Sequence, residues 1–164
     1  KNAIFKMIND AKREIFIQTP YFIPDDSVME AIKTAILSGV EVNLMVPSFG
    51  DHPLVYWANL SYIGELLNLG ANIYHYNQGF LHSKVVIVDD YVSTVGSANI
   101  DNRSFYLNFE VNAIIYDFDK NRELKDQFYK DIEVSTKYTL EKYNNRTRMT
   151  KIKESVSKLF SPIL

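Results

Sequence analysis

FLHSKVVIVDDYVSTVGSAN, residues Phe80–Asn99, is the stretch that decides the fold. Its centre, Val85–Val88, is an unbroken run of β-branched residues between polar ones, which is typical of a short, fully buried strand. Residues Tyr91–Val95 alternate weakly between apolar and polar and predict the partner strand of a hairpin. The small-residue turn Gly96–Asn99 ends this second strand and offers backbone amides and polar side chains to an anion.

Four side chains of this stretch are expected to gather at one edge of the sheet. His82 and Lys84 lie two residues apart, so their side chains leave the same face of an extended chain. Ser97 and Asn99 follow at the end of the partner strand. An imidazole, an ammonium, a hydroxyl and a carboxamide suit a phosphate ester. Lys84 and Asn99 would hold its oxygens, while His82 attacks phosphorus or moves a proton.

The pattern His-x-Lys-x(4)-Asp-x(6)-Gly-Ser-x-Asn fixes six residue types over eighteen positions. Average residue usage puts a chance match at a given position on the order of 10⁻⁷ to 10⁻⁸. The alternative is a structural histidine and a surface lysine on a hairpin. It does not explain why six residue types occur at these spacings. The pattern is the signature of the phospholipase D superfamily, which this sequence resembles without a missing element.

Composition limits the class of protein. The 164 residues are 46% hydrophobic and 13% aromatic, which indicates one folded domain and excludes general disorder. With 18 basic and 20 acidic residues the net charge is −2, so no nucleic-acid partner is expected. The chain has no cysteine, which excludes disulfides and thiolate metal sites. Its three histidines are too scattered for a set of metal ligands, and we predict no metal and no cofactor.

The rest of the chain predicts alternating helices and strands. Helical periodicity, two glycine stops and short β-branched runs give the order helix, strand, helix, strand, helix, strand at 2–13, 14–18, 26–38, 40–46, 54–69 and 72–76. Such crossovers build an α/β fold with parallel strands, and the hairpin adds antiparallel ones. We therefore expect a mixed, largely parallel β-sheet flanked by helices. Residues 109–116 predict a buried strand and 119–134 an amphipathic helix.

Glu110 is the acidic residue of the strand predicted at 109–116. A charge in an interior strand needs a partner, and His82 is the expected one, donating its second ring nitrogen to the carboxylate. The alternative is an ordinary surface glutamate. The resemblance implies the first, because an acidic residue downstream of the Gly-Ser-x-Asn turn orients the catalytic histidine in that superfamily.

Four further residues carry weaker signals. Asp89 lies at the hairpin turn and is expected to fix the turn by hydrogen bonds rather than to take part in chemistry. Gly96 belongs to the signature as a structural residue. His75 is expected to be packed in a strand. His52, in a loop, is either a phosphate or headgroup contact or a plain loop residue.

The resemblance extends over essentially the whole chain. Outside the signature it rests on four blocks, which together look like the C-terminal half of bacterial cardiolipin synthases of the phospholipase D type: 18–26, 51–58, 61–67 and 103–113. It implies a metal-free transfer between two phosphatidylglycerol molecules through a phosphohistidine, giving cardiolipin and glycerol. In that transfer Lys84 and Asn99 neutralise charge on the phosphoryl oxygens, with Ser97 in support.

This sequence departs from the family in carrying one signature where the family has two. His82 alone cannot be both the nucleophile and the acid for the leaving group. The partner is expected to be an N-terminal phospholipase D-like half of the same protein, because the chain starts at Lys1 without Met; a homodimer is the alternative. In the family the C-terminal histidine more often serves as the acid/base, so the resemblance implies that role for His82, with the nucleophile as the alternative. The isolated chain is expected to be nearly inactive.

Two other functions remain open at this point. One is a homodimeric phospholipase D-like phosphodiesterase or nuclease, with one signature in each subunit. The net charge and the many aromatic residues argue mildly against it. The other is a non-catalytic module that binds anionic headgroups, against which the intact signature argues.

The C-terminal segment differs from residues 1–145, the expected catalytic domain. Residues 146–164 hold five basic residues and one acid, with Ile152, Val156, Leu159 and Phe160 on one helical face. A basic amphipathic helix can lie on an anionic membrane surface. A helix docked on the domain with its charges in water is equally compatible with the pattern. The resemblance implies that the intact protein is associated with the bacterial cell membrane.

Overall fold

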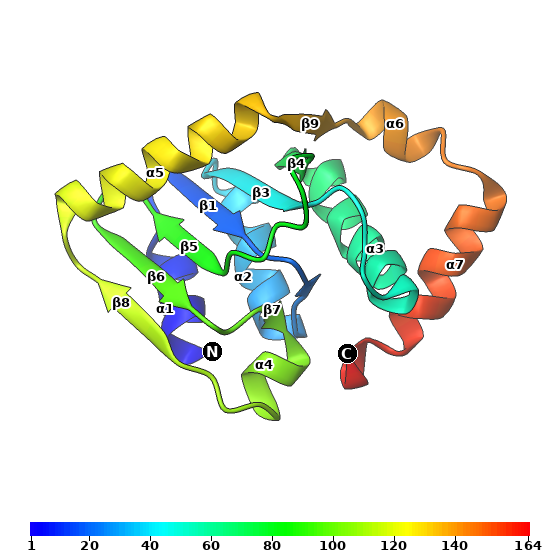
Figure 1. The fold of residues 1–164 in the computed structure, drawn as a ribbon, viewed down its shortest axis with the longest axis horizontal. Helices are drawn as coiled ribbons and strands as arrows, with labels where there is room; N and C mark the ends of the chain where they lie inside the picture. Colours follow the sequence, from blue (N-terminus) through cyan, green and yellow to red (C-terminus); the bar gives the residue numbers. More distant parts are fainter.

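A computed structural model describes residues 1–164 as a seven-stranded sheet in the order β8-β6-β5-β1-β3-β4-β9, with a separate two-stranded sheet, β2-β7 (Figure 1). The strands are β1 (Glu14–Gln18), β2 (Phe22–Ile23), β3 (Glu41–Pro47), β4 (Asn72–Tyr76), β5 (Val85–Val88), β6 (Val92–Gly96), β7 (Ile100–Asp101), β8 (Asn112–Ile115) and β9 (Ser135–Tyr138). The helices are α1 (Asn2–Asp10), α2 (Asp26–Leu37), α3 (Pro53–Leu69), α4 (Asn102–Tyr106), α5 (Phe118–Glu133), α6 (Leu140–Asn144), α7 (Arg148–Leu159) and the 3₁₀ turn η1 (Ser161–Ile163).

The mixed α/β sheet is confirmed, but it is less parallel than predicted. Within the seven-stranded sheet only the pairs β1–β3 and β3–β4 are parallel, whereas β1–β5, β5–β6, β6–β8 and β4–β9 are antiparallel. A parallel pair requires a crossover connection, which α2 and α3 provide. β5 and β6 form a hairpin, which is antiparallel by construction. The other three antiparallel pairs, β1–β5, β6–β8 and β4–β9, join strands that run in opposite directions.

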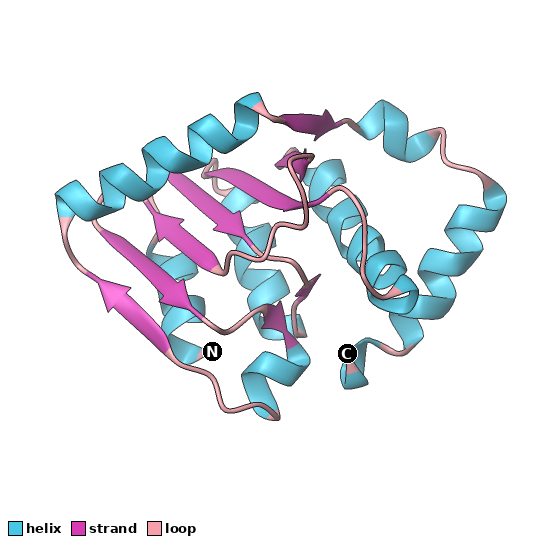
Figure 2. Ribbon diagram, viewed as in Figure 1, coloured by secondary structure: helices cyan, strands magenta, loops and turns pink.

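Helices cover both faces of the sheet, and two apolar clusters result (Figure 2). Ile15 and Ile17 of β1 belong to the large cluster with α1, α2 and α3. Phe16 points to the other face, where its ring meets that of Phe128 on α5 with centroids 5.0 Å apart. Burial on both faces explains why the central strands are continuous apolar runs.

The expected helix limits are close to those observed. Asp25 caps α2 by accepting a hydrogen bond of 2.9 Å from the backbone N–H of Val28. Gly39 and Gly70 follow α2 and α3 with φ of 88° and 101°, a left-handed conformation that favours glycine. These local signals therefore set where the chain turns back toward the sheet.

The strand predicted at 109–116 is shorter and more exposed than expected. Only Asn112–Ile115 pairs, as β8, and it forms the edge of the sheet beyond β6. Phe109 is fully exposed, and Val111 and Ile114 are exposed as well. An apolar run predicts burial only where another layer covers it, and no helix of this chain covers the outer side of β8.

The chain after β9 forms α6 and α7, and α7 packs on α3. Glu154 and Ser157 of α7 are buried at this contact, whereas Ile152, Val156 and Leu159 are exposed. The helix thus turns its polar side toward the domain. None of the helices combines the length and the apolar character that crossing a bilayer requires.

Candidate active site

The β5–β6 hairpin holds the first two signature residues at its open end. The Lys84 ammonium donates a hydrogen bond of 2.9 Å to the carbonyl oxygen of His82, and the carbonyl oxygen of Lys84 accepts one of 3.3 Å from Gly96 N–H. His82 is exposed, makes no side-chain hydrogen bond, and lies beside Phe80 with ring centroids 5.9 Å apart. Its imidazole is therefore accessible to a ligand or a partner.

Lys84 is half-buried between the hairpin and two carboxylates. Burial lowers the pKa of its ammonium below the ordinary value, and the nearby charges of Glu110 and Asp101 oppose that shift. A partly desolvated cation next to exposed backbone suits a phosphoryl oxygen, because its attraction for an anion is less screened than in water.

Glu110 lies in the loop before β8 and binds the signature turn. Its carboxylate accepts hydrogen bonds from the Ser97 hydroxyl, from Asn108 Nδ2 at 3.1 Å and from Ser104 Oγ at 3.5 Å. Ser97 Oγ in turn accepts a bond of 3.0 Å from Val111 N–H. Glu110 therefore fixes the position of the Gly-Ser-x-Asn turn.

The expected hydrogen bond between Glu110 and His82 is not formed in this structure. Glu110 precedes β8 and His82 precedes β5, and β6 lies between these two strands. Two strand spacings, about 10 Å, separate β5 from β8. The Glu110 charge instead reaches Lys84.

Asn99 is held through Ser104, which the sequence analysis missed. The backbone N–H of Asn99 donates to Ser104 Oγ at 3.0 Å, and Ser104 N–H donates to the Asp101 carboxylate at 2.7 Å, which caps α4. The signal was present as Asp-x-x-Ser, a capping pattern directly after the signature. Asn99 Oδ1 is buried without a hydrogen-bond partner, so the amide has an unsatisfied acceptor.

A cavity of about 320 Å³ lies beside Asn99. Parallel pairing of β2 with β7 brings the Tyr21 segment next to the signature turn. His52, left open by the sequence, lines the same cavity, as do Tyr21, Asp101 and Arg103; His82 and Lys84 do not. No three histidine or carboxylate side chains lie together as metal ligands in residues 1–164.

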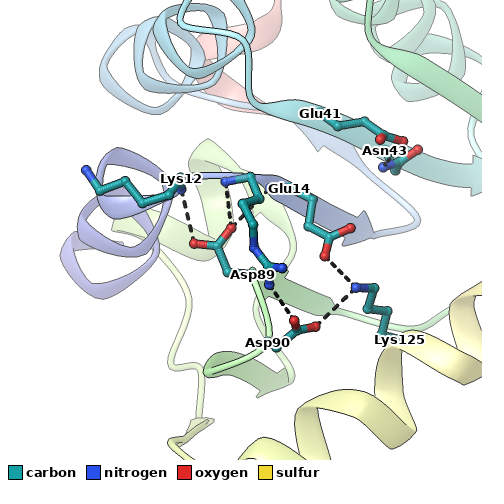
Figure 3. A network of polar contacts seen from close by, with 8 residues as sticks. Lys12, Glu14, Glu41, Asn43, Asp89, Asp90 and Lys125 are labelled. Carbon is teal, nitrogen blue, oxygen red and sulfur yellow. Dashed lines mark hydrogen bonds and ion pairs between the residues drawn. The ribbon is translucent and has the colours of Figure 1, made fainter.

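Asp89 lies at the other end of β5 from Lys84. Figure 3 shows its carboxylate directed toward Lys12 and the start of β1. Its carboxylate accepts hydrogen bonds from the backbone N–H groups of Lys12, Arg13 and Glu14 at 3.1, 2.9 and 3.0 Å. Its neighbour Asp90 pairs with Lys125 of α5 at 3.1 Å. The signature aspartate thus contacts the start of β1 and lies away from the side chains gathered around Lys84.

Comparison with protein families gives one match over most of the chain. The family model described as "Cardiolipin synthase, PLD-like domain" matches residues 4–132. The major cardiolipin synthase ClsA of Bacillus subtilis is 56% identical over 164 residues, which are all of this chain and 34% of that protein. Cardiolipin synthase 2 of Staphylococcus epidermidis is 54% identical over the same share of each chain. The chain spans about a third of the length of these curated relatives.

Solved structures share the fold at low identity. A phospholipase D family member, Nuc from Salmonella typhimurium, superposes with a TM-score of 0.73 and 22% identity, covering 84% of this chain and 90% of its own. Phosphatidylserine synthase of Haemophilus influenzae superposes with a TM-score of 0.77 and 17% identity, over 98% of this chain and 42% of its own. These likenesses show the fold alone.

Proposed function

The chain belongs to the phospholipase D-like domain family of cardiolipin synthases, and on that premise we propose that it supplies one half of a phosphatidyltransferase active site. The reaction joins two phosphatidylglycerol molecules into cardiolipin and releases glycerol. The observation that carries the proposal is the complete signature. Its Lys84, Ser97 and Asn99 lie at the open end of one hairpin, in a chain 56% identical to a cardiolipin synthase.

The proposed chemistry has two steps, each with a proton transfer. In the first, a histidine nitrogen attacks phosphorus, the bond from phosphorus to the glycerol oxygen breaks, and a second histidine protonates that oxygen. In the second, the latter histidine removes a proton from the hydroxyl of another phosphatidylglycerol. That oxygen attacks phosphorus and the phosphorus–nitrogen bond breaks. We assign the acid/base role to His82.

The other signature residues hold and neutralise the phosphoryl group. The half-buried Lys84 ammonium and the Asn99 amide would bind its oxygens, which gain charge during attack. Ser97 and Ser104 support this arrangement from the side of Glu110. The hydrogen bonds that Glu110 accepts from Ser97 and Ser104 support its role as a positioning residue. That Glu110 orients a histidine stays a prediction.

The cavity beside Asn99 is the proposed place for the headgroup of a lipid substrate. Arg103 and His52 can donate hydrogen bonds to a phosphate, and both line the cavity. Arg103→Gln in the full-length protein is expected to raise KM for phosphatidylglycerol severalfold with a smaller change in kcat. An unchanged KM would remove Arg103 from this assignment.

The second histidine has to come from outside this chain. We propose that it belongs to a second phospholipase D-like half of the same protein. A homodimer, with one His82 from each copy, is the alternative arrangement, and it also fits a phosphodiesterase or nuclease.

The test uses the full-length protein that contains this chain. His82→Ala and Lys84→Ala are each expected to abolish conversion of phosphatidylglycerol into cardiolipin and glycerol, measured by mass spectrometry. Lys12→Ala, an exposed lysine on the far side of the hairpin, serves as the control and should leave the rate unchanged. Turnover that survives His82→Ala contradicts the assignment, and cleavage of DNA without any lipid transfer favours the nuclease.

A further inference from the structure

Helix α7 meets the body of the molecule with its polar side. Glu154 is 3% exposed and receives the Arg146 guanidinium at 2.8 Å, and Ser157 is equally buried. Lys158 pairs with Glu65 of α3. The side-chain contacts that α7 makes with α3 are therefore those of its charged residues, since Lys153 and Lys158 also lie over the rings of Trp57 and Tyr62.

The opposite side of α7 is apolar and open to solvent. At 3.6 residues per turn, the apolar residues fall on the side away from Glu154 and Ser157. Ile152 is 56% and Leu159 78% exposed, and the exposed set continues along the helix and past its end: Met149, Val156, Phe160 and Ile163. A helix on a water-facing surface normally shows the reverse arrangement, so this stripe needs an apolar partner.

The charges around this stripe define the partner's chemistry. Arg148 is exposed at its start and Lys151 on its flank, whereas the exposed Lys153 places its ammonium over the Trp57 ring of α3, 5.0 Å from the centroid. Between Lys142 and Leu164 the exposed charged side chains are all basic, because the single acid, Glu154, is buried. An apolar stripe bordered by basic residues complements a surface that is apolar below and anionic at its boundary.

We propose that α7 docks the chain on an anionic phospholipid bilayer, with the helix in the plane of the interface. The stripe would enter the boundary between headgroups and acyl chains, while Arg148 and Lys151 reach the anionic headgroups. None of these residues belongs to the proposed transfer site, so bilayer docking is testable whether or not the transfer occurs.

The docking face continues toward the signature. A cavity of about 530 Å³ is lined by Leu159 at the end of α7 and by Tyr106 and Leu107 at the end of α4, both exposed. Helix α4 also carries Ser104, which holds Asn99. In this orientation the end of α4 that lines the cavity would face the membrane surface.

The experiment measures cosedimentation of this chain with vesicles of equimolar phosphatidylglycerol and phosphatidylcholine, compared with vesicles of phosphatidylcholine alone. Binding to the anionic vesicles is expected to exceed binding to the neutral ones and to weaken with salt. Arg148→Glu with Lys151→Glu is expected to reduce binding to anionic vesicles by roughly tenfold or more. Leu159→Ser, which removes the most exposed residue of the stripe, should weaken binding severalfold.

Matched controls lie elsewhere on the molecule. Arg122→Glu with Lys130→Glu makes the same charge change on two exposed residues of α5, and Leu37→Ser changes a leucine of α2 that is 73% exposed. Both should leave binding unchanged, and circular dichroism melts check that every variant is folded. Equal losses in the α7 variants and the controls overturn the proposal. So does a dimer in solution that Leu159→Ser dissociates without any change in vesicle binding.

Discussion

His75 shows how a single buried side chain makes stability depend on pH. Its ring is buried in β4 and stacks on Tyr138 at a centroid distance of 4.6 Å. Burial, with a smaller contribution from the Lys142 charge, lowers its pKa from 6.5 to about 4. Between these values the unfolded chain binds a proton that the folded chain does not. Stability therefore falls as pH drops from about 6.5 to 4, by about 3 kcal/mol.

His75→Phe removes this titration and keeps a ring against Tyr138. We expect the free energy of unfolding of the variant to fall less between pH 7 and pH 4.5 than that of the parent chain. Urea denaturation at the two pH values measures the difference. Parallel losses in both proteins would mean that other groups cause the acid sensitivity.

Asp89 has φ of 53° and a carboxylate that accepts three backbone N–H groups. Asp89→Ala leaves those donors unsatisfied in a buried place and is expected to cost about 3 kcal/mol of unfolding free energy. Asp89→Asn keeps an acceptor and tolerates the left-handed conformation, so a loss of about 1 kcal/mol is expected. Thermal melts against Asp126→Ala, an exposed carboxylate without partners, provide the measurement. Equal effects of Asp89→Ala and Asp126→Ala would contradict this account.

The side chains of the candidate site were predictable only in part. Lys84, Ser97 and Asn99 come from one continuous signature, so local spacing was enough to bring them to one hairpin end. The distance between Glu110 and His82 depends on the order of strands in the sheet, because β6 lies between β5 and β8. No local sequence pattern gives that order. Ser104 was overlooked because its role depends on a short helix that periodicity does not detect.

At the scale of elements, the close approach of β6 and β8 depends on Gly96. A Cβ at this position would lie 2.2 Å from the carbonyl oxygen of Val111 and 2.5 Å from Asn112 Cα. These are backbone atoms of the paired strand, which cannot move aside at low cost. The signature glycine therefore permits the pairing that brings Glu110 to Ser97.

Gly96→Ala is expected to separate β8 from β6 and to lower the free energy of unfolding by about 2–3 kcal/mol, as overpacking does. Hydrogen exchange should show faster exchange of the β8 amides and of Val111 N–H. Ala113→Gly, on exposed β8, makes the reverse change and should cost about 1 kcal/mol or less. A Gly96→Ala chain as stable as the parent would show that β8 pairs differently.

Periodicity located most elements because the central strands are buried on both faces and their helices carry clear stops. Periodicity did not predict the exposure of β8 or the orientation of α7. β8 has the composition of an interior strand, but its outer side is uncovered. The sequence predicted the apolar stripe of α7. It could not predict which side of the helix faces α3, because that depends on residues of α3 such as Glu65, which pairs with Lys158. An element's sequence gives its stripe, and its neighbours decide which side is buried.

At the scale of the whole molecule, the C-terminal helices join the α/β body as part of one packed unit. Gly64 of α3 leaves room for the Tyr143 ring, since a Cβ there would lie 2.0 Å from its Cζ and hydroxyl oxygen. The Arg146 guanidinium lies over the same ring, with Cζ 3.3 Å from its centroid. We therefore expect residues 1–164 to unfold together. Deletion of 146–164 would expose this face of α3, so point variants test membrane binding more cleanly.

The ion pair between Arg146 and Glu154 is the most buried ion pair of the molecule, and we expect it to hold α7 in place on α3. Both side chains are largely buried, and Arg146 Nε lies 3.0 and 2.8 Å from the two carboxylate oxygens. Glu154→Ala leaves the guanidinium without its partner, which is expected to cost about 3 kcal/mol. Replacing both, as Arg146→Met with Glu154→Leu, removes the unpaired charge and should restore much of that stability.

Hydrogen exchange with mass spectrometry distinguishes loss of docking from general unfolding. In Glu154→Ala the amides of α7 should exchange faster while those of β1 and β3 stay protected, and the double variant should recover protection in α7. Faster exchange throughout the sheet would mean that the pair stabilises the entire fold. Unchanged exchange of α7 would mean that Lys158 and Glu65 hold the helix without it. Faster exchange confined to α7 would show that this pair keeps the polar side of α7 on α3. The apolar stripe of the helix faces outward for that reason.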